Sequence, residues 1–521
     1  MKKILIVLLL ILSVNFNNIE IFANNKLSPY TRAWIYNKSR EAKDNLNEKS
    51  DKLSNSYVKS SVSAITGEEY IGVFLSVEDL SILSEIESLG GLVNFAKNDI
   101  VVARIPVDML TVLSELEGVK CVEVERPIQL NNDKARSKSS VDAVHNGSYE
   151  LPNPYKGDGV LVGIFDCGID FNHLAFMDEN GDSRVQRAYI PDSEEGTAPV
   201  LSDGTVLAGS AYDNPTDISS LTTDTYNISH GTHVTGIAAG SYMGNEYYGM
   251  APESSLILTS MSNLSEYNII CAVQYIMDEA DKLDMPVSVN CSLGYYNGAH
   301  DGSTLLCKTI DELTGAGKIV SISTGNAGGD KVYVTKEFTN VDTSLKTLIV
   351  SKSANYSYLF GDLSAWNNSD NAIGVRIFVY SFSEGKIVYE SEIFKPESSD
   401  SFIIETADYP ELEAYYEGSV SLTSGINSSN NKYEIYSTFT MTSDDYSEGT
   451  DPDYCMGVEF IGGDGDNIDV WGDYAYTYFS AEGISDFVDG TSDYSVNVMA
   501  TGENIISVGS YNSKLSYTTL D

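Results

Sequence analysis

The pattern of apolar and polar positions changes several times along the chain. Residues 24–65 are polar, rich in Lys, Asn, Ser and Glu, and show no sustained apolar period. Such a segment buries too little apolar surface to offset the entropy lost on ordering. We therefore expect a flexible leader there, with regular elements beginning near Tyr70.

Residues 66–130 alternate strand and helix patterns. The first helix is expected to open at Ser76, with Asp79 three residues later, and to end at Gly90. Pro106 is expected to begin the second helix. Strands are predicted over residues 70–75, 92–96, 100–105 and 119–124. This β-α-β-β-α-β order predicts a ferredoxin-like α+β module.

Residues 151–330 combine short apolar strands with helical patterns, which predicts a parallel α/β sheet. The clearest strands are residues 160–165, 256–258, 287–291 and 319–322, and the clearest helix is residues 269–283. From 331 to 495 the pattern becomes strand alternation with turns rich in Gly and Asp, which predicts an inserted all-β sandwich. Residues 496–521 contain an apolar strand at 505–509 that is expected to return to the parallel sheet.

The N-terminus has the pattern of an export signal. Lys2 and Lys3 precede an apolar run over residues 4–14, and small Ala23 suits the last position before cleavage. We assign residues 1–23 to a signal peptide and expect a secreted or cell-surface product. No later stretch reaches the roughly 18 uninterrupted apolar residues of a membrane helix, so no membrane span is predicted.

The charge balance limits the partners. A formal net charge of -43 repels phosphate backbones, so nucleic acid is not expected as a partner. Acidic loops favour calcium, and Asp178, Asn180 and Asp182 alternate around a glycine as the ligands of calcium loops do. A plain acidic turn explains the same residues equally well. Both interpretations stay open, and no cofactor other than a structural calcium is expected.

The six cysteines show no C-x-x-C spacing and are too few for a disulfide scaffold. Four of them lie in apolar strand or helix patterns. We expect most of the cysteines to be small core residues.

Residues 229–240 read SHGTHVTGIAAG, in which glycines and small residues let a histidine-bearing helix pack closely under a cleft. Upstream, an apolar strand delivers Asp166 to its C-terminal end, where α/β folds place their chemistry. A lone histidine in a glycine-rich stretch is more commonly structural or a metal ligand. The combination of His230 with Asp166 favours catalysis over that interpretation.

Other stretches extend the pattern. Residues 166–170 read DCGID, residues 249–252 read GMAP, residues 292–294 read SLG and residues 323–329 read STGNAGG. With the histidine motif, these blocks resemble, in the same order, those of the subtilisin-like serine peptidases. The resemblance covers residues 65–330 and resumes from about 495.

The resemblance implies an α/β fold with a subtilisin-like parallel sheet flanked by helices, acting on polypeptide substrates. Asp166 and His230 would be catalytic, and Asn326 would donate to the oxyanion. Ser292, Leu293 and Gly294 would pair with an extended substrate and form a wall of the specificity pocket. It also implies that the ferredoxin-like module is a propeptide inhibiting its own chain, followed by a processing linker over residues 131–150.

The nucleophile is not found among these residues. The family places its serine in a G-T-S-M-A-x-P block after the last strand, and the 521 residues contain no such block. The Gly-Thr-Ser at 490–492 continues with Asp493 and precedes the strand at 505–509, so Ser492 is not expected to attack substrate. We therefore expect a C-terminally truncated precursor of a serine endopeptidase.

Two other functions stay open. The chain could be a catalytically inactive protein that binds peptides, or a surface adhesin that uses the β-sandwich. Tyr333, Trp366 and Trp471 could then stack on sugars, although aromatic residues of strands more commonly pack in the core.

Overall fold

The structure is a computed structural model. It describes residues 26–28, 31–32, 34–35, 38, 61–62, 69–124, 129–130, 139–148, 150–221, 229–243, 248–351, 358–395, 400–443, 453–473 and 477–510. The predicted signal peptide, residues 511–521 and parts of the predicted leader and processing linker lie outside the described residues. The chain divides into two compact units, one made of Met1–Tyr57, Asp108–Val124 and Lys331–Thr491, the other of Val58–Val107, Glu125–Asp330 and Ser492–Asp521.

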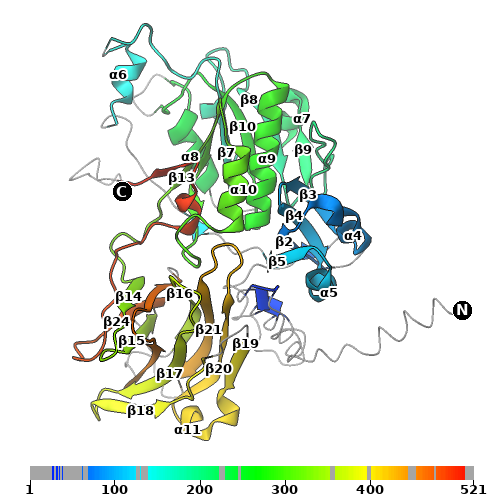
Figure 1. Cartoon of the computed structure of the whole chain (residues 1–521). Coiled ribbons are helices and arrows are strands. Elements are labelled where there is room, and N and C mark those ends of the chain that lie inside the picture. Colours follow the sequence, from blue (N-terminus) through cyan, green and yellow to red (C-terminus); the bar gives the residue numbers. More distant parts are fainter. Residues whose placement is uncertain are drawn as a thin grey trace, which may run out of the picture. The chain divides into compact units, whose positions relative to one another are not determined.

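A seven-stranded sheet forms the centre of the second unit (Figure 1). Its neighbouring strands are parallel except for the last pair, which is antiparallel. Across the sheet the order is β25 (Ile505–Val508), β13 (Lys318–Ser323), β11 (Val287–Cys291), β7 (Leu161–Asp166), β10 (Ser255–Ser260), β8 (Val185–Ile190) and β9 (Ser210–Tyr212). The predicted parallel sheet and the return of the chain through β25 are thus confirmed.

Helices cover both faces of this sheet. Alternation along β7 sends Leu161 and Phe165 into the core shared with α9 (Glu266–Lys282) and α10 (Leu305–Leu313). Val162 and Ile164 face the other way, into the core shared with α8 (His230–Ala239). Short elements complete the unit: α6 (Val141–His145), η4 (Leu174–Phe176), α7 (Pro215–Ser220) and η6 (Val498–Thr501).

Strands of the predicted ferredoxin-like module lie against α9 and α10 (Figure 1). Phe74, Phe95 and Val102 belong to the same core as the residues of α9. The Arg104 guanidinium lies 5.5 Å from the centre of the Tyr267 ring on α9. These antiparallel strands run in the order β1 (Ser61–Val62), β2 (Glu69–Val77), β4 (Ile100–Pro106) and β3 (Leu92–Lys97). The strands β2, β3 and β4 therefore pack on the side of the parallel sheet that α9 and α10 cover.

The remaining elements of the module follow the predicted order, with one correction. The first helix does not open at Ser76, which lies inside β2. Asp79 opens it instead, since its carboxylate accepts a hydrogen bond from the Ser81 N–H at 2.8 Å. Aspartate is the stronger cap here because β2 continues through Val77. The helical elements and last strand are η2 (Leu80–Ile82), α4 (Leu83–Ser88), η3 (Val107–Met109), α5 (Leu110–Glu115) and β5 (Val119–Val124).

Part of the predicted leader carries structure. The backbone of residues 26–28 lies beside β5, where the Val122 N–H donates to Lys26 O at 2.7 Å and the Ser28 N–H donates to Val122 O at 3.1 Å. Trp34 is buried, with 2% of its surface exposed. Backbone pairing with β5 and the burial of one large side chain stabilise this part of the leader. Neither interaction requires a periodic apolar pattern, which is why the sequence did not predict it.

The inserted region is a pair of antiparallel sheets around one core, as predicted. One sheet has the order β14 (Tyr333–Glu337), β23 (Asn467–Gly472), β16 (Tyr358–Asn367), β21 (Tyr433–Ser443), β20 (Tyr416–Ile426) and β19 (Asp400–Glu405). The other has the order β18 (Lys386–Glu390), β17 (Gly374–Ser381), β22 (Tyr454–Ile461), β15 (Ser344–Ser351) and β24 (Thr477–Ser480). Short helical turns η5 (Thr406–Asp408) and α11 (Pro410–Glu413) precede β20.

The aromatic residues considered for sugar binding are buried in this sandwich. Tyr333, Trp366 and Trp471 expose 3–4% of their surfaces. The Tyr333 and Trp471 rings lie 5.0 Å apart, and the Trp366 indole N–H donates to Ser364 Oγ at 2.7 Å. These contacts place the three side chains in the packing of the sandwich.

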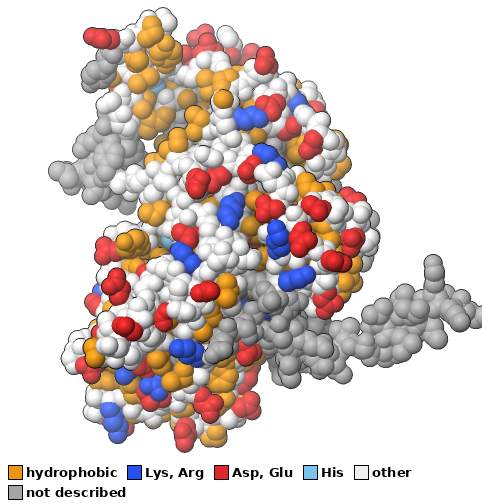
Figure 2. All heavy atoms as spheres, in the orientation of Figure 1, with side chains coloured by type: hydrophobic (Ala, Val, Ile, Leu, Met, Phe, Trp, Pro, Cys, Tyr) orange, Lys and Arg blue, Asp and Glu red, His pale blue; other side chains and the backbone are white. Residues whose placement is uncertain are grey.

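All six cysteines are buried and none forms a disulfide, which confirms their role as core residues. Acidic side chains are scattered among basic and apolar ones over the face drawn in Figure 2, without forming one patch. Within the described part of the chain, no helix has the length and apolar character needed to cross a membrane.

Candidate active site

Asp166 is the last residue of β7 and is completely buried. Its Oδ1 accepts a hydrogen bond from the Cys167 N–H at 2.7 Å. Burial raises the pKa of the Asp166 carboxyl, while hydrogen bonds from His230 and Cys167 oppose that rise. A cation beside this buried carboxyl would stabilise its ionised form.

His230 supplies that partner from the first position of α8. Its Nδ1 lies 2.6 Å from Asp166 Oδ1, and its side chain is 10% exposed. Because an ionised carboxylate can only accept, the Nδ1 atom carries the hydrogen of this bond. The other nitrogen, Nε2, is then the one with a lone pair for a proton, as a general base requires.

Backbone contacts lock the two motifs together. The Gly231 N–H donates to Cys167 O at 2.6 Å, and the Thr232 N–H donates to Gly168 O at 3.1 Å. The Thr232 hydroxyl also donates to Gly168 O at 2.9 Å and accepts from the Asp170 N–H at 2.8 Å. The start of α8 is therefore held against the turn that follows β7, which fixes the distance between the histidine and the aspartate.

Gly231 is required for this approach, and its replacement by alanine is expected to lower the free energy of unfolding by about 1–3 kcal/mol. A Cβ there would lie 2.5 Å from Ile169 Cγ1 and 2.8 Å from Cys167 O. Gly236→Ala on the same helix is the matched control, because its Cβ would meet no atom within 4 Å. Urea unfolding should show the control stabilised by about 0.5–1 kcal/mol. Equal stability of the two variants would contradict the close packing.

The opposite end of α8 is held by Arg184, which the sequence analysis did not single out. This buried side chain donates to Ser254 O at 2.6 Å, Ala175 O at 3.2 Å, Ser241 Oγ at 2.9 Å and also to Ala239 O, near the end of α8. Burial lowers the pKa of the guanidinium to about 10. A cation at the C-terminus of a helix also meets the negative end of its dipole.

Asn326 follows β13 and is exposed. The predicted wall residues lie nearby, with Leu293–Gly294 forming the short strand β12 directly after β11. A cavity of about 530 Å³ borders both Ser292 and Asn326 and extends along Val234 and Ile237 of α8. The oxyanion candidate, the wall and the histidine helix therefore surround one cavity.

Strand β12 already pairs with another extended segment. Gln129–Leu130 forms β6, which runs antiparallel to β12 with Leu130 opposite Leu293 and Gln129 opposite Gly294. An extended substrate would pair with the same backbone groups.

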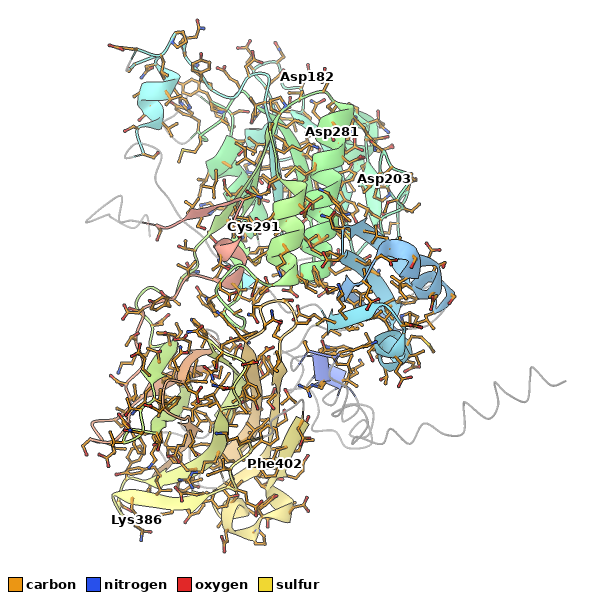
Figure 3. All side chains as sticks on the ribbon, in the orientation of Figure 1. Asp182, Asp203, Asp281, Cys291, Lys386 and Phe402 are labelled. Carbon is orange, nitrogen blue, oxygen red and sulfur yellow. The ribbon has the colours of Figure 1, made fainter. Side chains whose placement is uncertain are left out.

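The predicted calcium loop forms a tight turn. Asp178 Oδ1 accepts the N–H groups of Asn180 at 2.8 Å and Asp182 at 2.9 Å, and these bonds lower the pKa of Asp178. Figure 3 shows Asp182 on a peripheral loop, apart from Cys291 in the sheet. Among the described residues, one group of three possible metal ligands lies within 4.8 Å, and it is Asp166, Cys167 and His230. Calcium at residues 178–182 stays a prediction.

The only Gly-Thr-Ser of the chain does not begin a helix. Thr491 pairs with Tyr333 of β14 through two backbone hydrogen bonds of 2.8 and 3.2 Å, and Ser492 is exposed in the bend that follows.

Comparison with known proteins identifies the family. The model of the subtilase family, peptidase S8, matches residues 157–444, which include Asp166, His230 and Asn326. The chain belongs to the subtilase family. It is 27% identical over 263 residues to the PII-type proteinase of Lactococcus lactis subsp. cremoris, covering 49% of this chain and 13% of that protein. It is 27% identical over 174 residues to subtilisin DY of Bacillus licheniformis, covering 33% and 50%.

A solved structure is similar to this chain in fold. The structure of the CspB protease of Clostridium perfringens matches with a TM-score of 0.52 at 22% identity, covering 72% of this chain and 73% of that one. At this identity the likeness concerns the fold alone. The matched part spans only 13% of the PII-type proteinase, so the activity of this subtilase is a matter for proposal.

Proposed function

We propose that this subtilase is a secreted serine endopeptidase that cleaves peptide bonds through an acyl-enzyme. One observation carries the proposal: the 2.6 Å contact between His230 Nδ1 and the buried Asp166 carboxylate. This contact orients the imidazole with its second nitrogen available as a base.

Each predicted site residue would have a role in that reaction. His230 would take the proton of a serine hydroxyl and return it to the leaving amine, while Asp166 would stabilise the imidazolium. The Asn326 amide would donate to the oxyanion, an interaction worth on the order of 3 kcal/mol in transition-state stabilisation. Residues 292–294 would pair with the substrate backbone.

The pairing of β6 with β12 supports the proposal that the propeptide inhibits its own chain. Gln129–Leu130 occupies the backbone groups of Leu293–Gly294 that a substrate would need. The strands β2, β3 and β4 pack on α9 and α10 and would hold this segment in place. Cleavage in the linker at residues 131–150 would then separate the propeptide from the enzyme, and the propeptide could leave the substrate site.

The nucleophile is expected on an apolar helix that fits beside α8. The cavity next to Asn326 is lined by apolar residues of several elements, among them Val162, Val234, Ile237, Val289 and Ile322. An apolar helix that carries a serine at its start would bury these side chains and bring its hydroxyl to His230. A structural calcium at Asp178–Asp182 remains part of the proposal.

Hydrolysis of unstructured casein tests this function. The 521-residue chain and a version extended by any reading frame that follows Asp521 would be compared, each with a His230→Ala partner. We expect hydrolysis by the extended version and a loss of about 10⁶-fold in its His230→Ala variant.

The other outcomes are equally informative. Hydrolysis by the 521-residue chain that needs His230 would show that the nucleophile lies among these residues. If no version hydrolysed casein, the peptidase proposal would be contradicted, and peptide binding would be the next function to test. Activity that survives His230→Ala would exclude the mechanism.

A further inference from the structure

A slot beside the predicted wall of the specificity pocket is filled by the chain itself. The predicted wall contains Gly294 of β12, and the other side of the slot, which we call the Gly325 wall, contains Gly325 next to Asn326. Asn497 lies between them: a Cβ on Gly294 would be 2.4–2.7 Å from its side-chain amide, and a Cβ on Gly325 would be 3.5 Å from Asn497 Cβ.

Hydrogen bonds to the Gly325 wall and to η6 fix Asn497 in this position. Its N–H donates to Thr324 O at 2.9 Å, and its side-chain amide donates to Ser323 O. Its Oδ1 accepts the Ala500 N–H at 3.3 Å and so caps η6. The residue is completely buried. A residue held by one backbone and two side-chain hydrogen bonds is not readily displaced by a substrate.

Tyr296 also lies in this slot, with its hydroxyl against Gly325. Its hydroxyl accepts the N–H groups of Asn326 at 2.8 Å and Ala327 at 3.2 Å, and only 2% of the residue is exposed. A Cβ on Gly325 would lie 1.9 Å from this hydroxyl, and the φ of +97° at Gly325 also favours glycine. The phenol therefore occupies space that any larger group beside Gly325 would need.

We infer that Tyr296 and Asn497 restrict this peptidase to substrates with a small residue, glycine, alanine or serine, before the cleaved bond. The inference rests on the proposed function, because it places that residue between the Gly294 and Gly325 walls. The cavity of about 530 Å³ borders Gly325 and Asn326, whereas Gly294, Tyr296 and Asn497 are not among its lining residues. A leucine or phenylalanine side chain would have to displace buried, hydrogen-bonded groups.

Tyr296 is also a positioning residue for Asn326. The two N–H groups that it accepts belong to Asn326 and the next residue, so its hydroxyl sets the backbone from which the oxyanion donor extends. A donor must lie within about 3 Å of the developing oxyanion to be effective. The same hydroxyl thus limits substrate size and orients the catalytic amide.

Cleavage profiling tests the size restriction. Whichever form of the chain hydrolyses casein would digest a peptide library, and mass spectrometry would identify the residue before each cut. We expect glycine, alanine and serine at most sites. Asn497→Ser, which keeps a capping oxygen, should raise cleavage after leucine or methionine by about tenfold relative to alanine.

The outcomes separate this inference from the proposed function. Efficient cleavage after leucine or phenylalanine by the unaltered chain would overturn the size restriction and leave the peptidase proposal intact. Absence of cleavage by every form would overturn the proposed function, and the size restriction with it.

Hydrogen exchange tests the positioning role without any need for activity. In the 521-residue chain, Tyr296→Phe should speed exchange of the Asn326 and Ala327 amides by about tenfold, because both lose their acceptor. Tyr295→Phe is the matched control, since the Tyr295 hydroxyl contacts Glu266 instead. In an active form, Tyr296→Phe should lower kcat with little change in KM. Unchanged exchange at both amides would overturn the positioning role.

Discussion

Asp166→Asn is expected to lower kcat by about 10⁴-fold in the form of the chain that hydrolyses casein. An amide has no charge with which to stabilise the imidazolium of His230. Its NH₂ group can also donate to Nδ1, which would move the imidazole hydrogen to the nitrogen that must act as base. Steady-state kinetics on casein-derived peptides would measure the loss.

The free energy of unfolding is not expected to fall together with the activity. Burial raises the pKa of Asp166, so its carboxyl favours the folded state most when it is neutral, below its unfolded pKa. That contribution is lost as the pH rises through the folded pKa, and an ionised Asp166 at neutral pH is therefore a cost. Asparagine stays neutral, so the free energy of unfolding at pH 7 is expected to be unchanged or higher.

Asp203→Asn is the matched control for this variant. Asp203 is exposed, and its Oδ1 accepts the Thr205 N–H at 2.8 Å, a bond that an asparagine oxygen can also accept. Both activity and stability should be unaltered there. If Asp166→Asn kept full activity, or if the control lost it, the catalytic role of the buried carboxylate would be refuted.

Elements that are determined by residues adjacent in the sequence could be predicted. Strand β7 is a buried apolar run, and the glycines around His230 are adjacent in sequence, so both the strand end at Asp166 and the histidine helix could be inferred. Strand β11 was predicted with its observed limits, 287–291. In contrast, Arg184 directly precedes β8 and Arg187 lies within it, and these charges conceal the strand pattern.

Contacts between distant segments were not predictable. Tyr296 and Asn326 are 30 positions apart and Asn497 is a further 171 positions on, across the whole inserted sandwich. Only the fold brings them into one slot. The sequence does show an aromatic residue, Tyr296, two positions after the Ser-Leu-Gly block. The hydrogen bonds that its hydroxyl makes could not be predicted from that spacing. The leader shows the same limit, since its pairing with β5 depends on a strand about 90 positions away.

Arg184→Ala is expected to lower the free energy of unfolding of the second unit, Val58–Val107, Glu125–Asp330 and Ser492–Asp521, by about 3–5 kcal/mol, since several buried acceptors lose their donor. Those acceptors come from η4, α8 and the segment before β10, so the loss affects the elements that surround the histidine helix. Arg184→Lys should recover only part of the stability. A lysine ammonium is a single point donor and cannot reach four acceptors in the directions that the guanidinium fork provides.

Hydrogen exchange in β7 and β10 during urea unfolding would measure this effect, because both strands belong to the second unit. Lys156→Ala in the same unit is the matched control. Lys156 makes an exposed ion pair with Glu253 at 3.0 Å, with 40% and 52% of the two side chains exposed, so its loss should cost about 1 kcal/mol or less. If the two alanine variants were equally stable, the bonds from Arg184 to the carbonyls of Ala239 and Ser254 would not be what holds α8 in place. If Arg184→Ala were the less stable by the expected margin and also lost activity, the orientation of His230 would depend on both ends of its helix: on Gly231 at the start and on this buried guanidinium at the end.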